Sequence, residues 1–585
     1  MATRPKAVIE SRNGEKFSPI TIAKNVLTDD GQNLHDILSD RKEDMMTPTI
    51  ENSSSMFKIG QGNNVDYSEN VVDGAYESLV FKGKSLVNLL TKTIDTTWNL
   101  NRENWSIVTT ASSDYVLKPS TTYSVIVYVT EKTCPDREDL FWVGDVDGKK
   151  DKVTHDIVRK NVSLGANVFV INTVSDFSSV TSEHRGGIYF QGSKFVEGTL
   201  KWKAIVLEGD WTNKELPPYF EGICDCKSPI LTNVGKNLFN FSDSTMKSSW
   251  WINVENGITN VKKEDLSTNY SVIIPAQSNA KYKVSGNNIT RAFYAFLDKD
   301  YNVLYADEMV QRTTKSLSPQ GTAYALFYLN HEDIEKVTNL QIEEGSTATP
   351  YEPYKSNTTT FEQKDGKMIV LRSLPSGVCD TLNVETGEYT QRIGEVVLNG
   401  SEKWEVSGVV SKRYSLEAPI NSIVNTTKIL CICDKFPSIT TNQSDYDKLL
   451  GITITNGTRI MVNTNYDTID EFKQYLQQNL ATVQYELATP VVKIIDVQGF
   501  PYAYTNGHVQ LSSGSIEQSL TPKVEYSVVT NRNGQIRSNQ KMVERHQKQL
   551  DRLQAMILTN LVNTQYEQTL TNLKYDLKNV REEVK

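Results

Sequence analysis

The chain has 585 residues, too many for a single hydrophobic core, so we expect roughly three to five domains. Apolar residues make up 38 % of the sequence, and no stretch approaches the roughly eighteen consecutive apolar residues of a membrane-spanning helix. The net charge is -9, and the basic residues are scattered along the chain. We therefore expect neither membrane insertion nor nucleic-acid binding, since the latter needs a basic face.

The composition favours exposed β-structure. Tyr outnumbers Phe by 27 to 18, and many polar residues are interleaved with Val and Ile, which is typical of antiparallel sheets. Residues 1–14 alternate charged and small side chains and contain no apolar stretch. We therefore expect no secretory signal, and synthesis and folding in a cytoplasm.

The first 75 residues differ in character from the rest. Ile20–Ala23 predicts a short strand, and Asn25–Leu38 predicts a short helix. Residues 40–75 are rich in Ser, Asn, Asp and Gly and would bury little core on their own. We interpret residues 1–75 as an anchoring segment that becomes ordered against a partner.

An internal repeat follows this segment, with three landmarks in the same order in each copy. The opening, middle and closing landmarks of the first copy are Gly83–Leu89, Pro119–Val125, and Ile205–Gly209 followed by Pro217–Glu221. Those of the second copy are Gly235–Phe241, Pro275–Val284, and Leu340–Gly345 followed by Pro350–Tyr354. Apolar residues alternate with period two inside both copies, which predicts strands. We expect two tandem β-sandwiches or jelly rolls, at 76–228 and 229–356.

Residues 357–530 predict a third, mixed but mainly β domain. Met368–Leu371 and Gly451–Ile454 are strand-like, and Asp470–Leu476 predicts a helix with Thr468 or Asp470 as its N-cap. Val483–Leu487 returns to strand, and we expect Ala488–Pro490 to end it.

The C-terminal residues 531–585 predict a helical oligomerisation segment. Apolar residues recur at spacings of three and four, as in a coiled coil, with a polar interruption between two short seams. The seam residues are Val543, Leu550, Leu553, Ile557, Leu570, Leu573, Leu577, Val580 and Val584. An amphipathic helix or a helical hairpin that packs on its own sandwich is the alternative.

No pattern in the sequence predicts catalysis, a cofactor or a metal. The six His residues are far apart, and neither Cys224/Cys226 nor Cys431/Cys433 has further ligands nearby to complete a zinc site. Residues two apart on a strand share one face, so we expect both Cys pairs to be structural. We identify no catalytic, cofactor-binding or metal-binding residues and expect the protein not to be an enzyme.

Tryptophans are better candidates for binding, since sugar rings stack on exposed aromatic side chains. Trp250 and Trp251 are adjacent, so on a strand they point to opposite faces, and one of them could contact a glycan. The remaining six are expected in cores or interfaces: Trp98, Trp105, Trp142, Trp202, Trp211 and Trp404.

The bracketing motifs resemble those of minor structural and tail proteins of bacteriophages that infect low-GC Gram-positive bacteria. Gly-Lys-Asn-Leu-Phe at 235–239 and the stretch from Gln341 to Tyr354 match the ends of a carbohydrate-binding-module-like jelly roll closely, whereas 83–221 match them loosely. The third region adds Leu371–Asp380, Gln391–Gly394 and Thr482–Pro490. The resemblance covers roughly residues 83 to 526.

The resemblance implies a virion protein of a viral tail, baseplate or tail fibre, made in the bacterial cytoplasm and acting in host attachment through receptor binding. The implied partners are other tail or baseplate proteins, further copies of the chain in a homotrimer, and a cell-wall polysaccharide or teichoic acid. Residues 1–75 would then be the virion anchor. A structural adaptor or neck appendage without receptor binding is the alternative, and a cell-envelope-degrading tail enzyme is a lesser one.

Overall fold

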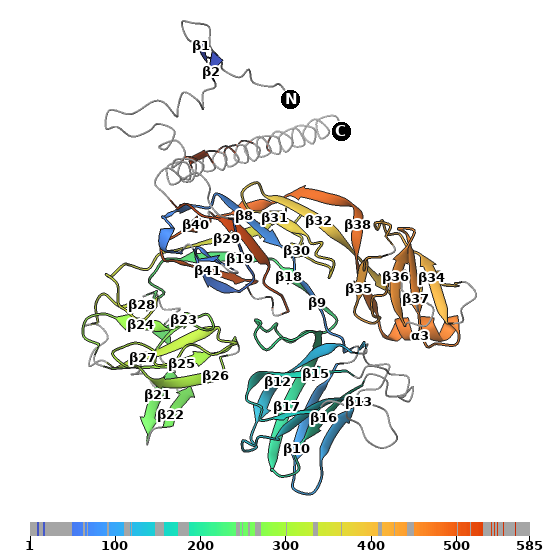
Figure 1. The fold of residues 1–585 in the computed structure, drawn as a ribbon, viewed down its shortest axis with the longest axis horizontal. Helices are drawn as coiled ribbons and strands as arrows, with labels where there is room; N and C mark the ends of the chain where they lie inside the picture. The colour runs from blue at the N-terminus through green and yellow to red at the C-terminus, as the bar shows by residue number, and fades with distance from the viewer. Residues whose placement is uncertain are drawn as a thin grey trace, which may run out of the picture. The chain divides into compact units, whose positions relative to one another are not determined.

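The structure is a computed structural model with two compact units (Figure 1). The larger unit comprises Thr49–Glu69 and Ser78–Tyr526, and the smaller one Met1–Pro48, Asn70–Glu77 and Ser527–Lys585. The described residues are 9–10, 16–17, 49–62, 65–66, 68–90, 93–109, 117–118, 120–146, 157–173, 187–240, 246–247, 250–255, 258–263, 271–289, 291–299, 301–330, 337–363, 365–407, 412–425, 427–441, 450–499, 501–514, 516, 518–530, 540, 543, 544, 547, 551, 554, 558 and 568.

Antiparallel sheets dominate the described residues, which confirms the predicted mainly β class. The α-helix described over its full length is α3 (Ile469–Gln478), and η1 (Ser68–Asn70) is a short 3-10 helix. In the smaller unit, β1 (Ile9–Glu10) pairs with β2 (Lys16–Phe17). No helix within the described residues is long and apolar enough to cross a membrane.

Several predicted elements lie outside the described residues. They are the strand at Ile20–Ala23, the helix at Asn25–Leu38 and most of the C-terminal seam. Of the seam residues only Val543 is described, and it is helical with 65 % of its surface exposed. No coiled-coil segment is seen among the described residues, so oligomerisation through this segment stays a prediction.

The larger unit contains a platform of strands, and three hairpins of this platform each carry a domain in place of a turn. In the first hairpin, β9 (Ser85–Val87) pairs with β18 (Ile223–Lys227), and Val87 lies opposite Ile223. The residues between them form the first insert. Its two ends therefore leave and re-enter the platform side by side.

The other two hairpins follow the same plan. β19 (Ile230–Val234) pairs with β29 (Ser356–Glu362), and the second insert lies between Val234 and Ser356, which are paired. β32 (Glu388–Leu398) pairs with β38 (Ala481–Ile494), and the third insert lies between Leu398 and Ala481, which are also paired.

The platform draws its strands from distant parts of the sequence. One sheet has the order β3-β42-β8-β31-β32-β38-β35, a second has β39-β29-β19-β41-β4, and a third has β30-β18-β9. Ile50 in β3 lies opposite Tyr526 in β42, so the two ends of the larger unit are neighbours. The remaining bounds are β3 (Ile50–Asn52), β4 (Met56–Lys58), β8 (Ser78–Lys82), β30 (Val370–Leu371), β31 (Thr381–Asn383), β35 (Cys431–Cys433), β39 (Asp496–Gln498), β41 (His508–Ser512) and β42 (Lys523–Ser527).

The expectation that Pro490 ends a strand is wrong. β38 continues through it to Ile494, and the pairing with β32 shifts register between Gln391 and Ile393. The shift leaves residues 487–490 unpaired with β32. A bulge of this kind accommodates proline because no ladder hydrogen bond is required from its nitrogen.

In the first insert, two four-stranded sheets enclose one core. Their orders are β10-β17-β12-β15 and β11-β16-β13-β14. Trp202 is fully buried in this core, and its ring packs against those of Trp98, Phe141 and Phe190. The strands are β10 (Asp95–Leu100), β11 (Ser106–Thr109), β12 (Thr122–Lys132), β13 (Phe141–Val146), β14 (Ile157–Lys160), β15 (Gly165–Asn172), β16 (Gly187–Gly192) and β17 (Gly198–Glu208).

The second insert has a five-stranded sheet of order β20-β23-β27-β25-β26 and two pairs, β24-β28 and β21-β22. Buried residues form separate clusters around Tyr282 and around Leu326. The strands are β20 (Met246–Lys247), β21 (Trp250–Glu255), β22 (Ile258–Lys263), β23 (Ser271–Pro275), β24 (Tyr282–Ser285), β25 (Arg291–Leu297), β26 (Val303–Glu308), β27 (Tyr324–Asn330) and β28 (Gln341–Glu344).

The two copies of the repeat share hydrogen bonds at their middle and closing landmarks. The Tyr123 hydroxyl accepts from the Lys118 amide at 2.8 Å, and the Tyr282 hydroxyl accepts from the Gln277 amide at 2.9 Å. Each tyrosine lies opposite a glutamate of the closing strand, Glu208 in the first copy and Glu344 in the second. These two landmarks therefore occupy the same places in both inserts.

The opening landmark shows a different register from the one predicted. The side-chain oxygen of Asn88 accepts from the amides of Leu90 and Val206, and that of Asn237 accepts from Phe239 and Ile342. Asn88 thus corresponds to Asn237, whereas the similarity of Gly83–Leu89 to Gly235–Phe241 had aligned it with Asn240. The shared element is Asn-Leu with one more apolar residue, and not the Gly-Lys pair.

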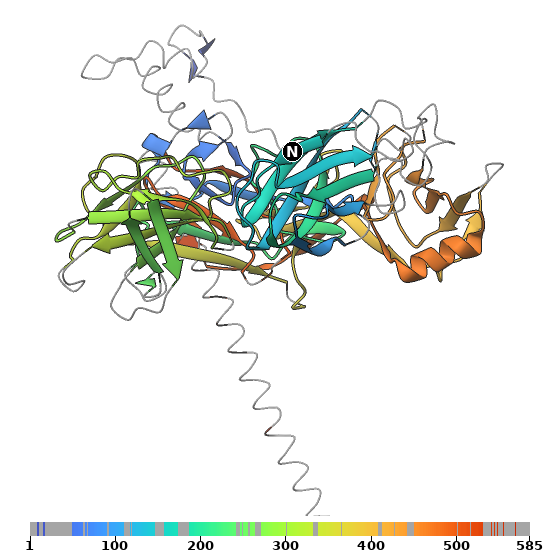
Figure 2. The same ribbon diagram turned by 90° about the horizontal axis from the view of Figure 1, so that it is seen from below.

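The third insert has a four-stranded sheet, β33-β34-β37-β36, and Figure 2 shows α3 at its edge. Thr468 caps α3 as predicted: its hydroxyl accepts from the Glu471 amide, while the Glu471 carboxylate accepts from the Thr468 amide. Phe472 and Leu476 of α3 are buried in the core beside Tyr414. The strands are β33 (Glu405–Val406), β34 (Arg413–Glu417), β36 (Gly451–Thr455) and β37 (Arg459–Asn463).

Candidate functional site

The outer face of the sheet β11-β16-β13-β14 in the first insert is the strongest candidate for a binding surface. Phe141, Val143 and Phe190 of these strands point into the core, so the residues between them point outward. The register places four outward residues in one row across all four strands: Ile107, Gln191, Trp142 and Arg159.

Three aromatic rings gather on this face. Trp105 lies 5.1 Å from Trp142 and 5.5 Å from Phe195, measured between ring centroids. The Trp142 indole N–H donates to the Asp139 carbonyl at 2.8 Å, which holds the ring in place. Both tryptophans are half-buried, whereas Phe195 is 49 % exposed and Ile107 is 52 % exposed.

Three cations lie over these rings. The Arg159 guanidinium carbon is 3.9 Å from the Trp142 ring centroid, and the Lys194 ammonium is 5.3 Å from that of Trp105. Arg137 lies 4.6 Å over Phe195 and also pairs with Asp139. Among the described residues, neither Arg159 nor Lys194 forms an ion pair with a carboxylate. We call these seven residues, Trp105, Ile107, Arg137, Trp142, Arg159, Lys194 and Phe195, the aromatic–basic face.

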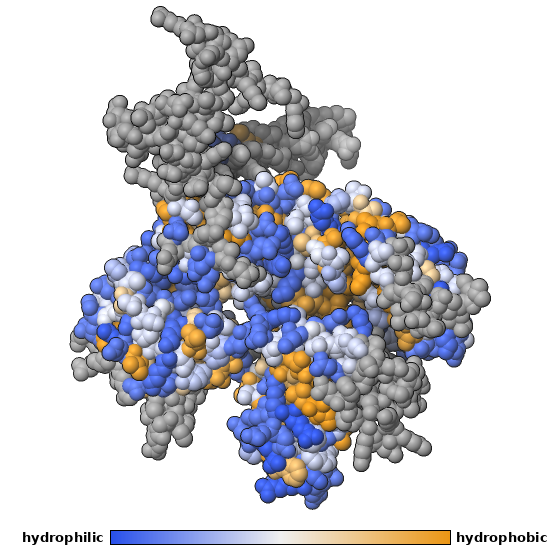
Figure 3. All heavy atoms as spheres, viewed as in Figure 1, coloured by the Kyte–Doolittle hydropathy of each residue, from blue (hydrophilic) through white to orange (hydrophobic). Residues whose placement is uncertain are grey.

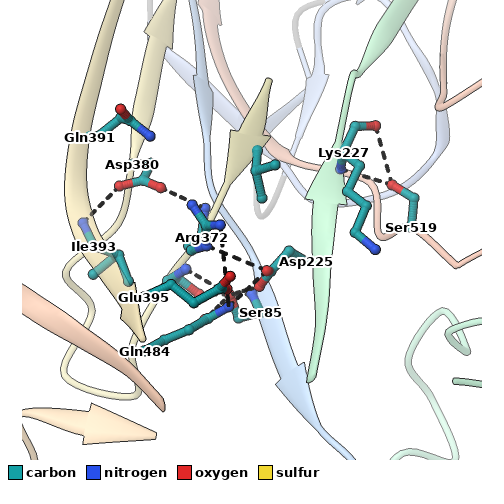
Figure 4. Close-up of polar contacts among 12 residues, drawn as sticks. Ser85, Asp225, Lys227, Arg372, Asp380, Gln391, Ile393, Glu395, Gln484 and Ser519 are labelled. Atoms are coloured by element: carbon teal, nitrogen blue, oxygen red, sulfur yellow. Dashed lines mark hydrogen bonds and ion pairs between the residues drawn. The ribbon is translucent and has the colours of Figure 1, made fainter. Parts of the chain in front are cut away.

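A buried polar network lies where the first insert joins the platform (Figure 4). Ser85 of β9 donates to Asp225 of β18 at 2.6 Å, and Gln484 of β38 donates to the other oxygen of Asp225 at 2.8 Å. Arg372 lies 3.6 Å from Asp225 and 3.3 Å from Glu395. Burial raises the pKa of Asp225, although Ser85, Arg372 and Gln484 oppose the shift. The network thereby ties the insert's entering and leaving strands to β32 and β38.

Asp380 belongs to the same region and is fully buried. Its carboxylate accepts from the backbone amides of Arg372, Arg392 and Ile393 at 3.0, 2.6 and 3.0 Å. Burial raises the pKa of Asp380 to about 6 despite these hydrogen bonds. The carboxylate therefore fixes the backbone of two segments against each other.

A cavity of about 380 Å³ adjoins the network. Its apolar lining includes Leu86, Leu207, Trp211 and Phe436, and Figure 3 shows apolar surface in the hollow where β9 and β18 lie in Figure 1. Asp434 also lines it, and burial raises the pKa of this carboxyl. Its oxygen accepts from the Thr482 amide at 2.8 Å, so it serves the joint of the third insert.

The cysteine pairs lie on β18 and β35 with their thiols free. Cys224, Cys226, Cys431 and Cys433 are buried, and burial raises the pKa of the Cys224 and Cys431 thiols to about 12. Within the described residues, no group of three or more His, Cys, Asp or Glu side chains is placed to hold a metal ion. Burial therefore keeps these thiols protonated, and a protonated thiol is a poor metal ligand.

The predicted glycan contacts are placed only in part. Trp250 and Trp251 begin β21 and lie opposite Lys263 and Lys262 of β22, but their side chains are outside the described residues. Trp98, Trp202, Trp211 and Trp404 are buried, as expected. Trp105 and Trp142, expected in a core or an interface, instead belong to the aromatic–basic face, which the sequence analysis missed. The alternation in Phe-Trp-Val at 141–143 was the available signal, since it sends Trp142 to the face opposite its neighbours.

No family model matches the chain, and no curated protein matches it either.

Proposed function

We propose that the chain is a virion structural protein of a bacteriophage tail, baseplate or tail fibre, and that its inserts attach the virion to glycans of the host cell wall. The bracketing motifs at 235–239 and 341–354 support the phage origin. We expect no enzymatic activity, and we expect residues 1–75 to anchor the protein in the virion and residues 531–585 to join it as a homotrimer.

We further propose that the first insert is a jelly roll of the carbohydrate-binding-module type. Its strands alternate between two sheets in the orders 10-17-12-15 and 11-16-13-14, which is the winding of two interlocked Greek keys. The shared bonds of Asn88 and Asn237, and of Tyr123 and Tyr282, support a related module in the second insert.

The single observation that carries the attachment role is the exposed aromatic–basic face. Aromatic and charged side chains with their polar heads accessible are what glycan recognition requires, and a purely structural insert would not need to keep Phe195 and Ile107 half exposed to water. The hairpin plan supports it further, because each insert extends from two paired strands that hold its base.

Two measurements test the proposal. Antibodies raised against the full-length protein should label the tail of phage particles in electron micrographs, and the purified protein should sediment with cell walls of a low-GC Gram-positive bacterium. Labelling without wall binding would favour the adaptor role over attachment. If no labelling of virions occurs and the protein is absent from purified particles, the virion assignment is wrong. Release of reducing sugar or peptidoglycan fragments would favour the tail enzyme instead.

A further inference from the structure

We propose that the outer edge of strand β9 and the cavity beside it bind an extended, uncharged peptide segment of a partner protein. The backbone of this segment would pair with Val87, and one of its apolar side chains would enter the cavity. The inference does not depend on the proposed attachment to glycans, because it concerns a different ligand at a different place.

The backbone of β9 forms hydrogen bonds with the β18 side of the sheet. The Lys84 carbonyl accepts from Cys226 of β18 at 3.1 Å, and the Asn88 amide donates to the residue directly before this strand at 2.8 Å. Backbone groups alternate between the two sides of a strand, so those of Ser85 and Val87 point away from β18.

The edge of β9 that points away from β18 is occupied at both ends and open at Val87. The Ser85 amide donates to the Ser373 hydroxyl at 3.0 Å, and the Leu89 amide donates to the Val206 carbonyl at 3.0 Å. Within the described residues, the Val87 N–H and carbonyl form no hydrogen bond. One donor and one acceptor are therefore available to the backbone of a further strand.

Val87 also lines the cavity of about 380 Å³, and every residue that lines this cavity is described. Apolar side chains reach the cavity from three parts of the larger unit: Leu207 and Trp211 of the first insert, Leu374 of the platform and Phe436 of the third insert. The volume is near the lower end of the range of about 300–1,000 Å³ that is typical of ligand sites, and it leaves room for a large apolar side chain.

The charges of the lining favour an uncharged segment. Lys118 pairs with Glu208 at 2.9 Å, and Lys435 pairs with Asp434 at 3.7 Å. These are the four charged side chains of the lining, so the lining has no net charge when all of them are ionised. A charged side chain placed between the two pairs would lose its hydration without gaining a counter-charge.

The open edge favours a peptide over a small apolar molecule. A small molecule would fill the cavity but would leave the Val87 N–H and carbonyl without partners. An extended peptide meets both requirements, because its backbone bonds to the strand edge while alternate side chains point into a pocket.

The test measures binding of blocked heptapeptides to the full-length protein by fluorescence anisotropy. Their sequence is Gly-Thr-Val-X-Val-Thr-Gly, with X as Leu, Phe, Ser, Glu or Lys. Two further peptides with X as Phe carry N-methyl groups on one or the other alternating set of amides. Only one of these sets can face β9, so we expect only one of the methylated peptides to lose binding.

Two substitutions, each with a matched control, locate the site. Val87→Pro removes the N–H at an edge position, where proline is tolerated, and Val87→Thr keeps the N–H as its control. Ile429→Trp places an indole in the cavity without altering β9. Val424→Trp is the matching control, because Val424 lies outside the cavity and is 72 % exposed.

We expect wild type to bind the Leu and Phe peptides at least about tenfold more tightly than the Ser, Glu and Lys peptides. Val87→Pro and Ile429→Trp should each weaken binding by about tenfold or more, whereas both controls should bind as wild type does. Equal binding of the two methylated peptides, or unchanged binding by Ile429→Trp, would overturn the inference. So would a wild-type protein that binds none of the peptides, and that result would leave the proposed attachment to glycans standing.

Discussion

His508 Nε2 lies 2.9 Å from Glu344 Oε2, and this contact joins strand β41 of the platform to strand β28 of the second insert. Gln277 of the same insert donates to the same oxygen at 2.6 Å. His508 is 1 % exposed, so its ring nitrogen has no access to water in place of the carboxylate. The pair therefore ties the second insert to β41, which pairs with β19 and places His508 opposite Val234 at the base of the insert.

Replacing Glu344 with alanine should loosen this joint. The change leaves the buried His508 ring nitrogen without a partner, which costs about 1–3 kcal/mol. We expect a lower melting temperature for the transition that contains the second insert, measured by calorimetry. Glu362→Ala, at an exposed position of β29, should change stability by no more than about 0.5 kcal/mol. Equal effects of the two substitutions would show that the His508 contact does not matter.

Arg372 should be more important to the joint of the first insert than its two ion-pair distances suggest. Arg372→Gln would leave Asp225 and Glu395 near each other without their shared cation, and breaking a buried pair in this way costs about 3 kcal/mol or more. Amide hydrogen exchange in β9 and β18 should accelerate. Arg102→Gln breaks a pair whose side chains are 73 and 67 % exposed, and it should leave these rates unchanged.

Asp380 should make the protein less stable as the pH rises, which is opposite to the usual effect of a carboxyl group. Its pKa is about 6 in the folded protein, above the ordinary value of 3.8, so the folded state holds the proton more tightly. The contribution of Asp380 to the free energy of unfolding is therefore complete below pH 3.8, its ordinary pKa. This contribution is lost as the pH rises through about 6, the pKa of Asp380 in the folded protein. The stability of wild type relative to Asp380→Asn should fall by up to about 3 kcal/mol between about pH 4 and pH 7.

Asp365 supplies the matching control, because its pKa shifts the other way. A hydrogen bond from the Lys367 amide lowers the pKa of this exposed carboxyl. The stability of wild type relative to Asp365→Asn should consequently rise slightly with pH as the carboxylate forms. A rise of the same sign for Asp380→Asn would mean that its three backbone hydrogen bonds outweigh burial.

Local patterns were sufficient to predict several strands and the middle and closing landmarks of the repeat. Period-two alternation found the strand around Tyr123, and the polar residues before Glu471 gave the start of α3. The order of the landmarks revealed the second copy, and the structure shows one backbone bond that both copies share, since the Gly209 and Gly345 amides donate to the carbonyls of the residues before Tyr123 and Tyr282. Strands and helix starts can be predicted because they depend on residues close in sequence, and the repeat can be predicted because both copies use the same residue types.

The platform could not be predicted in this way. Val87 pairs with Ile223, and Ile50 pairs with Tyr526. In neither pair does the sequence around one residue indicate which distant residue it pairs with. The aromatic–basic face was missed for a related reason. Hydrophobicity alone predicts that Trp142 is a core residue. The pairing of Trp142 with Gln191 and Arg159 shows that it lies on the outer face of the sheet instead.

Removal of the C-terminal segment should dissolve the oligomer. Burying each leucine of the predicted seam is worth about 1.5–3 kcal/mol, and in a trimer Leu570, Leu573 and Leu577 would be buried against the other copies of the chain. Light scattering should give a trimer for the full-length protein and a smaller species for a chain ending at Asn531. Leu573→Glu/Leu577→Glu should reproduce the truncation, whereas Lys574→Gln/Lys578→Gln, on the predicted outer side, should not. A truncated chain that keeps the full oligomeric state would place the assembly contacts elsewhere.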